Sequence, residues 1–94
     1  MKTEPIRWRE QIREAALRFL AKRSSVTFSL EEITRRIQDD HAVDREFDES
    51  HVNDALALLS GYGLVERIPR PLSGLEDFKV TAQGVVFMER NYGR

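Results

Sequence analysis

Residues 56–65 of this chain read LALLSGYGLV, an apolar run that passes through two glycines into Leu-Val. Apolar residues leading into it recur at helical spacing, at Val52, Ala55, Leu56 and Leu59. Gly61 and Gly63 are expected to end this helix, because glycine accepts the left-handed backbone found just beyond helix ends. The chain then continues as residues 64–68, LVERI, which have strand composition. The stretch therefore predicts a helix that turns directly into a strand.

Downstream, the sequence predicts a β-hairpin. Pro69 and Pro71 follow the first strand, and proline in a sheet is confined to edges and loops. Ser73 and Gly74 supply a turn, and residues 78–80 read as the returning strand.

Upstream, two more helices are predicted. The first covers about residues 6–22, with apolar residues at spacings of three and four. The second begins after Ser29, which has the capping-box spacing with Glu32, so that each side chain can bond the other's backbone N–H. Residues 26–28 between these helices form a candidate short strand.

Residues 39–49 are predicted to form a polar, acidic loop between the second and third helices. Val43 and Phe47 are expected to attach this loop to the core, and Asp48 or Ser50 to cap the third helix. After the hairpin, Thr81 is expected to cap a last helix. The predicted fold is mainly α with a small β-wing, an α+β class with the order α-β-α-α-β-β-α.

Three motifs resemble winged helix-turn-helix domains of the MarR and PadR transcription-regulator families. They are the helix-to-strand passage at 56–65, the segment 78–84 (FKVTAQG), which is similar to Tyr-x-Leu-Thr-x-x-Gly, and the helix start at 29–33 (SLEEI). The resemblance covers about residues 6–90. It implies that the third helix enters the major groove of DNA while the wing touches the backbone or minor groove.

The chain has 94 residues, which fits one domain spanning residues 1–94. It contains no cysteine, which excludes disulfides, thiolate metal sites and a cysteine nucleophile. No apolar run approaches the roughly 20 residues that span a bilayer, and the N-terminus lacks a signal-type segment. We expect a cytoplasmic protein that does not associate with membranes.

Charge is unevenly distributed along the chain. Residues 1–23 hold seven Lys and Arg against three Asp and Glu, whereas residues 24–60 hold three against nine. The predicted third helix has no Lys or Arg, although phosphate attraction supplies most non-specific DNA affinity. This acidic middle departs from the pattern expected of a DNA-binding surface.

The predicted function is nonetheless that of a small DNA-binding transcription regulator, acting on double-stranded DNA as a homodimer. Candidate DNA contacts lie on the third helix, the wing and the second helix: Ser50, His51, Asn53, Arg67, Arg70, Lys79, Arg35 and Arg36. Each charged residue among them has the alternative interpretation of an ordinary solvated charge. The alternative function is a winged-helix module that binds a protein partner and no DNA.

Candidate dimer contacts come from the two ends of the chain: Trp8, Phe87 and Tyr92. Either the first or the last helix could form a two-fold interface. The alternative interpretation is that these aromatic side chains cover the edge of a small core.

The sequence does not predict an enzyme. His41 and His51 lie ten residues apart without a tight ligand pair, so two surface histidines are the favoured interpretation over a metal site. Gly61 and Gly63 follow a helix, whereas the dinucleotide-binding fingerprint follows a strand. No cofactor or metal is expected.

Overall fold

The computed structural model describes residues 4–92, with side chains from residue 7 onward. Its elements follow the predicted order: α1 (Glu4–Ala21), β1 (Phe28–Ser29), α2 (Leu30–Asp39), α3 (Glu49–Gly61), β2 (Val65–Pro69), β3 (Glu76–Val80) and α4 (Ala82–Asn91). The α+β class and the element order α-β-α-α-β-β-α expected from the sequence are therefore confirmed.

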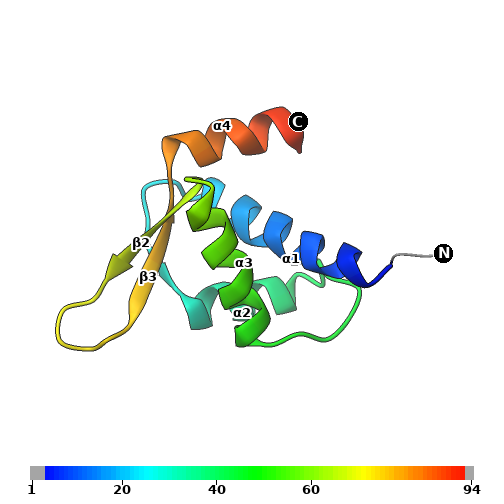
Figure 1. The fold of residues 1–94 in the computed structure, drawn as a ribbon, viewed down its shortest axis with the longest axis horizontal. Helices are drawn as coiled ribbons and strands as arrows, with labels where there is room; N and C mark the ends of the chain where they lie inside the picture. Colours follow the sequence, from blue (N-terminus) through cyan, green and yellow to red (C-terminus); the bar gives the residue numbers. More distant parts are fainter. Residues whose placement is uncertain (1–3, 93–94) are drawn as a thin grey trace.

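The helices α1, α2 and α3 pack together on one side of a small sheet, and the β2–β3 hairpin projects from this body as the wing (Figure 1). The sheet is antiparallel with the strand order β1-β3-β2, so β3 is the central strand. The last helix, α4, packs against α1 and β3 on the side away from α2.

Every element except β1 contributes buried residues to the core, and Phe28 of β1 is partly buried against it. The residues of α1 that point inward include Ile12, Leu17 and Leu20, each no more than 1% exposed. Phe78 of β3 is 2% exposed and links the sheet to the helices. The loop residues Val43 and Phe47 are partly buried against this core, as the sequence predicts.

Each internal helix begins at the residue type that the sequence indicates. The Ser29 hydroxyl accepts the backbone N–H of Glu32, and the Glu32 carboxylate accepts that of Ser29, which completes the capping box. Asp48 caps α3, and the Thr81 hydroxyl accepts the backbone N–H of Gly84 at the start of α4.

The strand boundaries differ from prediction by one or two residues. β1 begins only at Phe28, because its partner is Phe78 of β3, while the N–H of Val26 bonds the Arg23 carbonyl in a turn. Pro69 lies inside β2, opposite Glu76. This position is tolerated because β2 is an edge strand, where a missing N–H breaks no ladder on the outer side.

No helix within residues 4–92 combines the length and the apolar character that crossing a membrane requires.

Thr34 of α2 offers a test of the packing. It is 4% exposed, and its hydroxyl has no hydrogen-bond partner. A buried hydroxyl without a partner costs about 1–3 kcal/mol in proteins. We therefore expect Thr34→Val, which replaces that hydroxyl with a methyl group, to raise the free energy of unfolding by about 1 kcal/mol in urea titrations. A loss of stability would show that a partner satisfies the hydroxyl in solution.

Candidate nucleic-acid interface

The first turn of α3 is organised around the carboxylate of Asp48. Its Oδ1 accepts the Ser50 hydroxyl at 2.6 Å and the backbone N–H groups of Ser50 and His51 at 3.0 and 3.4 Å. In return, Nδ1 of His51 accepts the backbone N–H of Asp48 at 3.1 Å. The Ser50 side chain is exposed, but its hydroxyl proton is already committed to Asp48.

These bonds, above all that from the Ser50 hydroxyl, hold the pKa of Asp48 below its ordinary value. A carboxyl whose pKa is lower in the folded state stabilises the fold above its unfolded pKa, and this contribution is lost as the pH falls through the folded value. Asp48→Asn keeps an acceptor at the cap but cannot titrate. We expect the difference in urea midpoint between the protein and this variant to shrink below about pH 4. A difference that is constant with pH would contradict this account of the cap.

The ring of His51 packs against α1 and not toward the outward side of α3. Its centroid lies 5.0 Å from that of Trp8, with the planes at 87°. Its side chain is 29% exposed. This contact and the bond to Asp48 give His51 a structural role at the junction of α1 and α3.

Asn53 is exposed and lies where α2, α3 and the wing meet. A hollow of about 360 Å³ lies there, and its lining includes Asn53, Glu31, Glu49, Arg70 and Glu76. Among the candidates on α3, Asn53 therefore shares a concave surface with a basic residue of the wing. The same hollow contains three carboxylates, which makes its lining acidic.

The two arginines of the wing are paired with carboxylates of β3. Arg70 donates from Nε and one terminal nitrogen to Oδ1 of Asp77, at 3.0 and 2.9 Å, and this bond raises the pKa of Arg70. Arg67 lies 3.9 Å from a carboxylate oxygen of Glu76. Lys79 pairs in register with Glu66 across the hairpin but makes none of the ion pairs found within residues 4–92.

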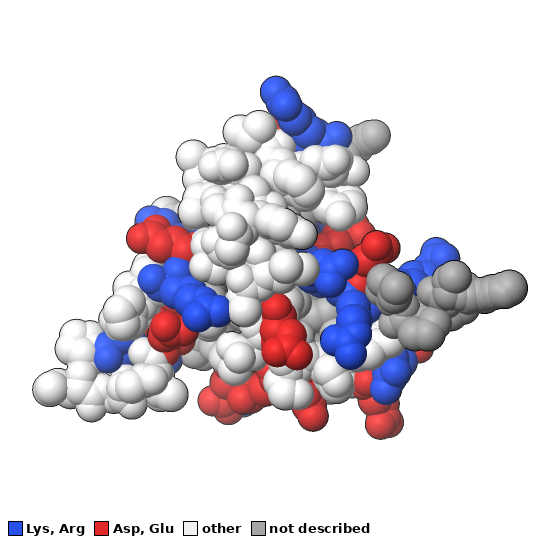
Figure 2. Space-filling model, in the orientation of Figure 1, with Lys and Arg blue, Asp and Glu red and all other residues white. Residues whose placement is uncertain are grey.

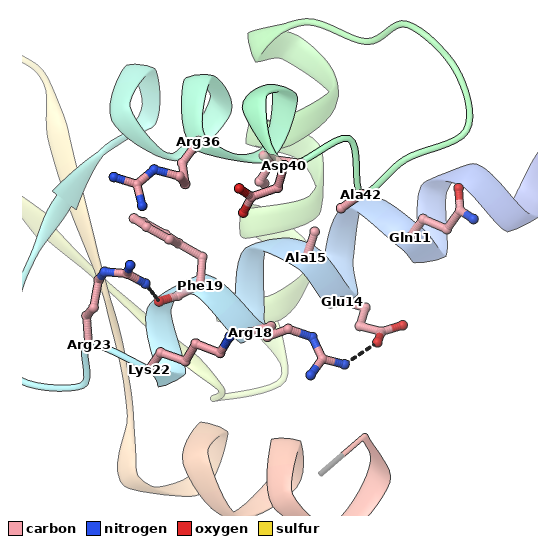
Figure 3. Close-up of a pocket in the computed structure, with 11 residues that line it drawn as sticks. Gln11, Glu14, Ala15, Arg18, Phe19, Lys22, Arg23, Arg36, Asp40 and Ala42 are labelled. Carbon is pink, nitrogen blue, oxygen red and sulfur yellow. Dashed lines mark hydrogen bonds and ion pairs between the residues drawn. The ribbon is translucent and has the colours of Figure 1, made fainter. Parts of the chain in front are cut away.

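The two adjacent arginines of α2 lie in different environments. Arg35 forms an exposed ion pair with Glu31 at 2.9 Å, one turn earlier on the same helix. The Arg36 guanidinium lies 5.6 Å from the centre of the Phe19 ring, on the side of α2 that faces α1 (Figure 3). Arg36 thus does not share a surface with α3 or the wing.

On the face drawn in Figure 2, the described residues form no broad basic surface over α3 or the wing. Figure 2 shows Lys and Arg side chains interspersed with Asp and Glu over the middle and lower parts of this face, below a largely uncharged surface over α4. The eight candidate DNA contacts are therefore brought together only in part: Asn53 and Arg70 share a hollow, whereas His51 and Arg36 point elsewhere.

The three candidate dimer contacts lie in two unlike settings. Trp8 packs on the core, and the guanidinium groups of Arg9 and Arg45 lie 4.7 and 4.2 Å from its ring centre. Phe87 of α4 and Tyr92, which directly follows that helix, lie 6.3 Å apart by ring centres and are 37% and 40% exposed. The α4 pair is thus the more accessible of the two.

The sequence did not predict the basic groove that lies on the face away from α3. The end of α1 contributes Arg18, Lys22 and Arg23 to a groove that Arg36 of α2 also lines (Figure 3). The only signal in the sequence is the run of basic residues at helical spacing near the end of the first helix, inside the basic segment 1–23.

Comparisons with known proteins identify the fold of this chain and give no more specific assignment. No protein-family model matches the chain, and no curated protein is similar to it. A solved structure described as a transcriptional regulator from Clostridium thermocellum superimposes with a TM-score of 0.72. It shares 16% sequence identity, and the match covers 96% of this chain and 82% of that one. At this identity the likeness shows that the two chains share a fold.

Proposed function

We propose that this chain is a single winged-helix domain that acts as a small transcription regulator and binds double-stranded DNA. The observation that carries the proposal is the shared hollow of Asn53 on α3 and Arg70 on the wing. In winged-helix recognition α3 enters the major groove while the wing reaches the backbone. An amide at the groove and a guanidinium beside it suit base-edge and phosphate contacts respectively.

The ion pairs on the wing do not prevent such contacts. Exposed pairs contribute only about 0–1 kcal/mol, so a DNA phosphate can replace Glu76 or Asp77 as the partner of Arg67 or Arg70. Lys79 is already available. The similarity to a transcriptional regulator of the same fold supports this assignment.

A second function is favoured by the charge of α3 itself. The helix carries Glu49 and Asp54 and no Lys or Arg, and its first turn is capped by Asp48. A basic protein partner would suit this surface better than DNA does. The alternative function is therefore a docking module for a protein with a basic contact surface.

The test is fluorescence anisotropy with a labelled random duplex from about 20 to 200 mM salt, a range over which phosphate contacts change affinity steeply. We expect binding that weakens as salt rises. The triple variant Arg67→Ala, Arg70→Ala, Lys79→Ala should weaken it further and reduce the salt slope by about 0.9 per lost phosphate contact.

Arg90→Ala on α4 is the matched control, since Arg90 is an exposed arginine on another element. It should leave both affinity and slope unchanged. An unchanged slope in the triple variant would reject the wing as the phosphate contact. No binding at the lowest salt would favour the docking function.

A further inference from the structure

The groove between the C-terminal halves of α1 and α2 is lined mainly by cations. It has a volume of about 390 Å³, within the range of small-molecule sites. Four basic side chains, Arg18, Lys22, Arg23 and Arg36, line it against two carboxylates, Glu14 and Asp40, which gives the lining a formal charge of +2. The residues of α3 and of the wing do not contribute to it.

The basic side chains of this groove differ in their ion-pair partners. Arg18 donates to Glu14, one turn earlier on α1, so these two charges cancel. Lys22, Arg23 and Arg36 make none of the ion pairs found within residues 4–92. Three cations, two from the turn that follows α1 and one from α2, thus share one groove, an arrangement that a bound anion would stabilise.

The Phe19 ring fixes where two of these cations lie. The Arg23 and Arg36 guanidinium groups are 4.6 and 5.6 Å from the centre of the ring, and Figure 3 shows them on either side of the Phe19 side chain. A terminal nitrogen of Arg23 also donates to the Phe19 carbonyl at 3.3 Å. Because cation–π contacts and this bond restrain the guanidinium groups, less entropy is lost when they bind an anion.

A role at the end of α1 explains only part of this arrangement. Cations near a helix C-terminus are favoured by the helix dipole, which accounts for Lys22 and Arg23. The same effect favours a cation at Arg36, which lies in the last turn of α2. It does not explain why the Arg36 side chain turns toward α1 and the Phe19 ring, while its neighbour Arg35 pairs with Glu31.

We propose that this groove is a binding site for a small phosphate monoester, on the face opposite α3. The phosphate would lie between Arg23 and Arg36 with Lys22 at its edge, since the guanidinium fork matches phosphate oxygens. A monoester carries close to two negative charges at neutral pH, which matches the charge of the lining. The rest of the ligand would cover Ala15 and Ala42 and offer hydrogen-bond donors to Asp40.

The site does not rest on DNA binding, and its test uses the free protein. Phenyl phosphate is titrated into ¹⁵N-labelled protein at pH 7.5 and constant ionic strength, and binding is monitored by the amide chemical shifts. Inorganic phosphate and a short DNA duplex are titrated in parallel. We expect phenyl phosphate to shift amides of residues 18–23 and 36–42 saturably. Arg36→Gln should weaken this binding about tenfold, through loss of one charge-assisted hydrogen bond.

Arg35→Gln is the matched control, because it removes the same charge from the adjacent position outside the groove. It should leave the affinity within about twofold, a change of under half a kcal/mol. Lys22→Gln repeats the test from α1, at an exposed position where loss of folding is not expected.

Three results would overturn the proposal. One is shifts that do not saturate. Another is equal loss of binding in Arg35→Gln and Arg36→Gln. The third is a result in which the duplex shifts these amides, the shifts depend on Arg36, and phenyl phosphate does not shift the amides. That result would assign the groove to nucleic acid.

Discussion

Gly84→Ala is expected to destabilise the protein by about 3 kcal/mol, which is the upper end of the usual cost of overpacking. A Cβ at this position would lie 2.1 Å from the Leu64 carbonyl oxygen and 2.7 Å from Cγ2 of Val80. The first turn of α4 and the start of β2 would have to separate. Their separation would also disturb the Thr81 N–H bond to the Leu64 carbonyl. Thermal unfolding should show the melting temperature falling by about 15 °C, given 4–8 °C per kcal/mol for a small chain.

Gly61→Ala is the matched control. Gly61 is also a helical glycine, at the end of α3, but nothing lies within 4 Å of a Cβ built there. Alanine is favoured over glycine within helices by up to about 1 kcal/mol, so this variant should be as stable as the protein or slightly more so. Equal losses in the two variants would mean that the contact between α4 and β2 is not what requires glycine at position 84.

Phe78→Ala should cost about 3–5 kcal/mol, the range found when a buried phenylalanine is truncated. Phe78 is 2% exposed and sits on the central strand, paired with Phe28 on one side and Arg67 on the other. Its loss would leave a cavity where the sheet meets the helices. Urea unfolding should show the midpoint falling sharply, because the whole stability of a small protein is about 5–15 kcal/mol.

Phe87→Ala makes the same chemical change on a side chain that is 37% exposed. It should cost less than about 1 kcal/mol, since little apolar surface is returned to water. A loss as large as that of Phe78→Ala would mean that something outside the chain buries Phe87. A second copy packed on α4 is the candidate, and the loss would then depend on protein concentration.

The elements were predictable where local chemistry decides them. Ser29 and Thr81 cap their helices as expected, because a capping bond spans only three residues and can be read from the sequence. β1 was placed two residues early at its start, since its position depends on pairing with Phe78, fifty residues away. Boundaries fixed by distant partners are not visible in local composition.

The candidate site was less predictable for the same reason. Arg70 and Asp77 are seven residues apart, and only the hairpin register brings their side chains to 2.9 Å. The groove brings together Arg23, just after α1, and Arg36 of α2, and their proximity depends on how α1 and α2 pack around Phe19. The charge distribution placed basic residues near the first helix, but it could not tell which face they share.

The contact between Trp8 and His51 has a practical consequence for spectroscopy. Trp8 is the only tryptophan of the chain, and its ring contacts the His51 imidazole. Nδ1 of that imidazole accepts the backbone N–H of Asp48 at the start of α3. The emission of Trp8 therefore reports on the region where α1, the loop residue Arg45 and the start of α3 meet. Any ligand or partner that shifts the start of α3 should change this intrinsic signal without an added label.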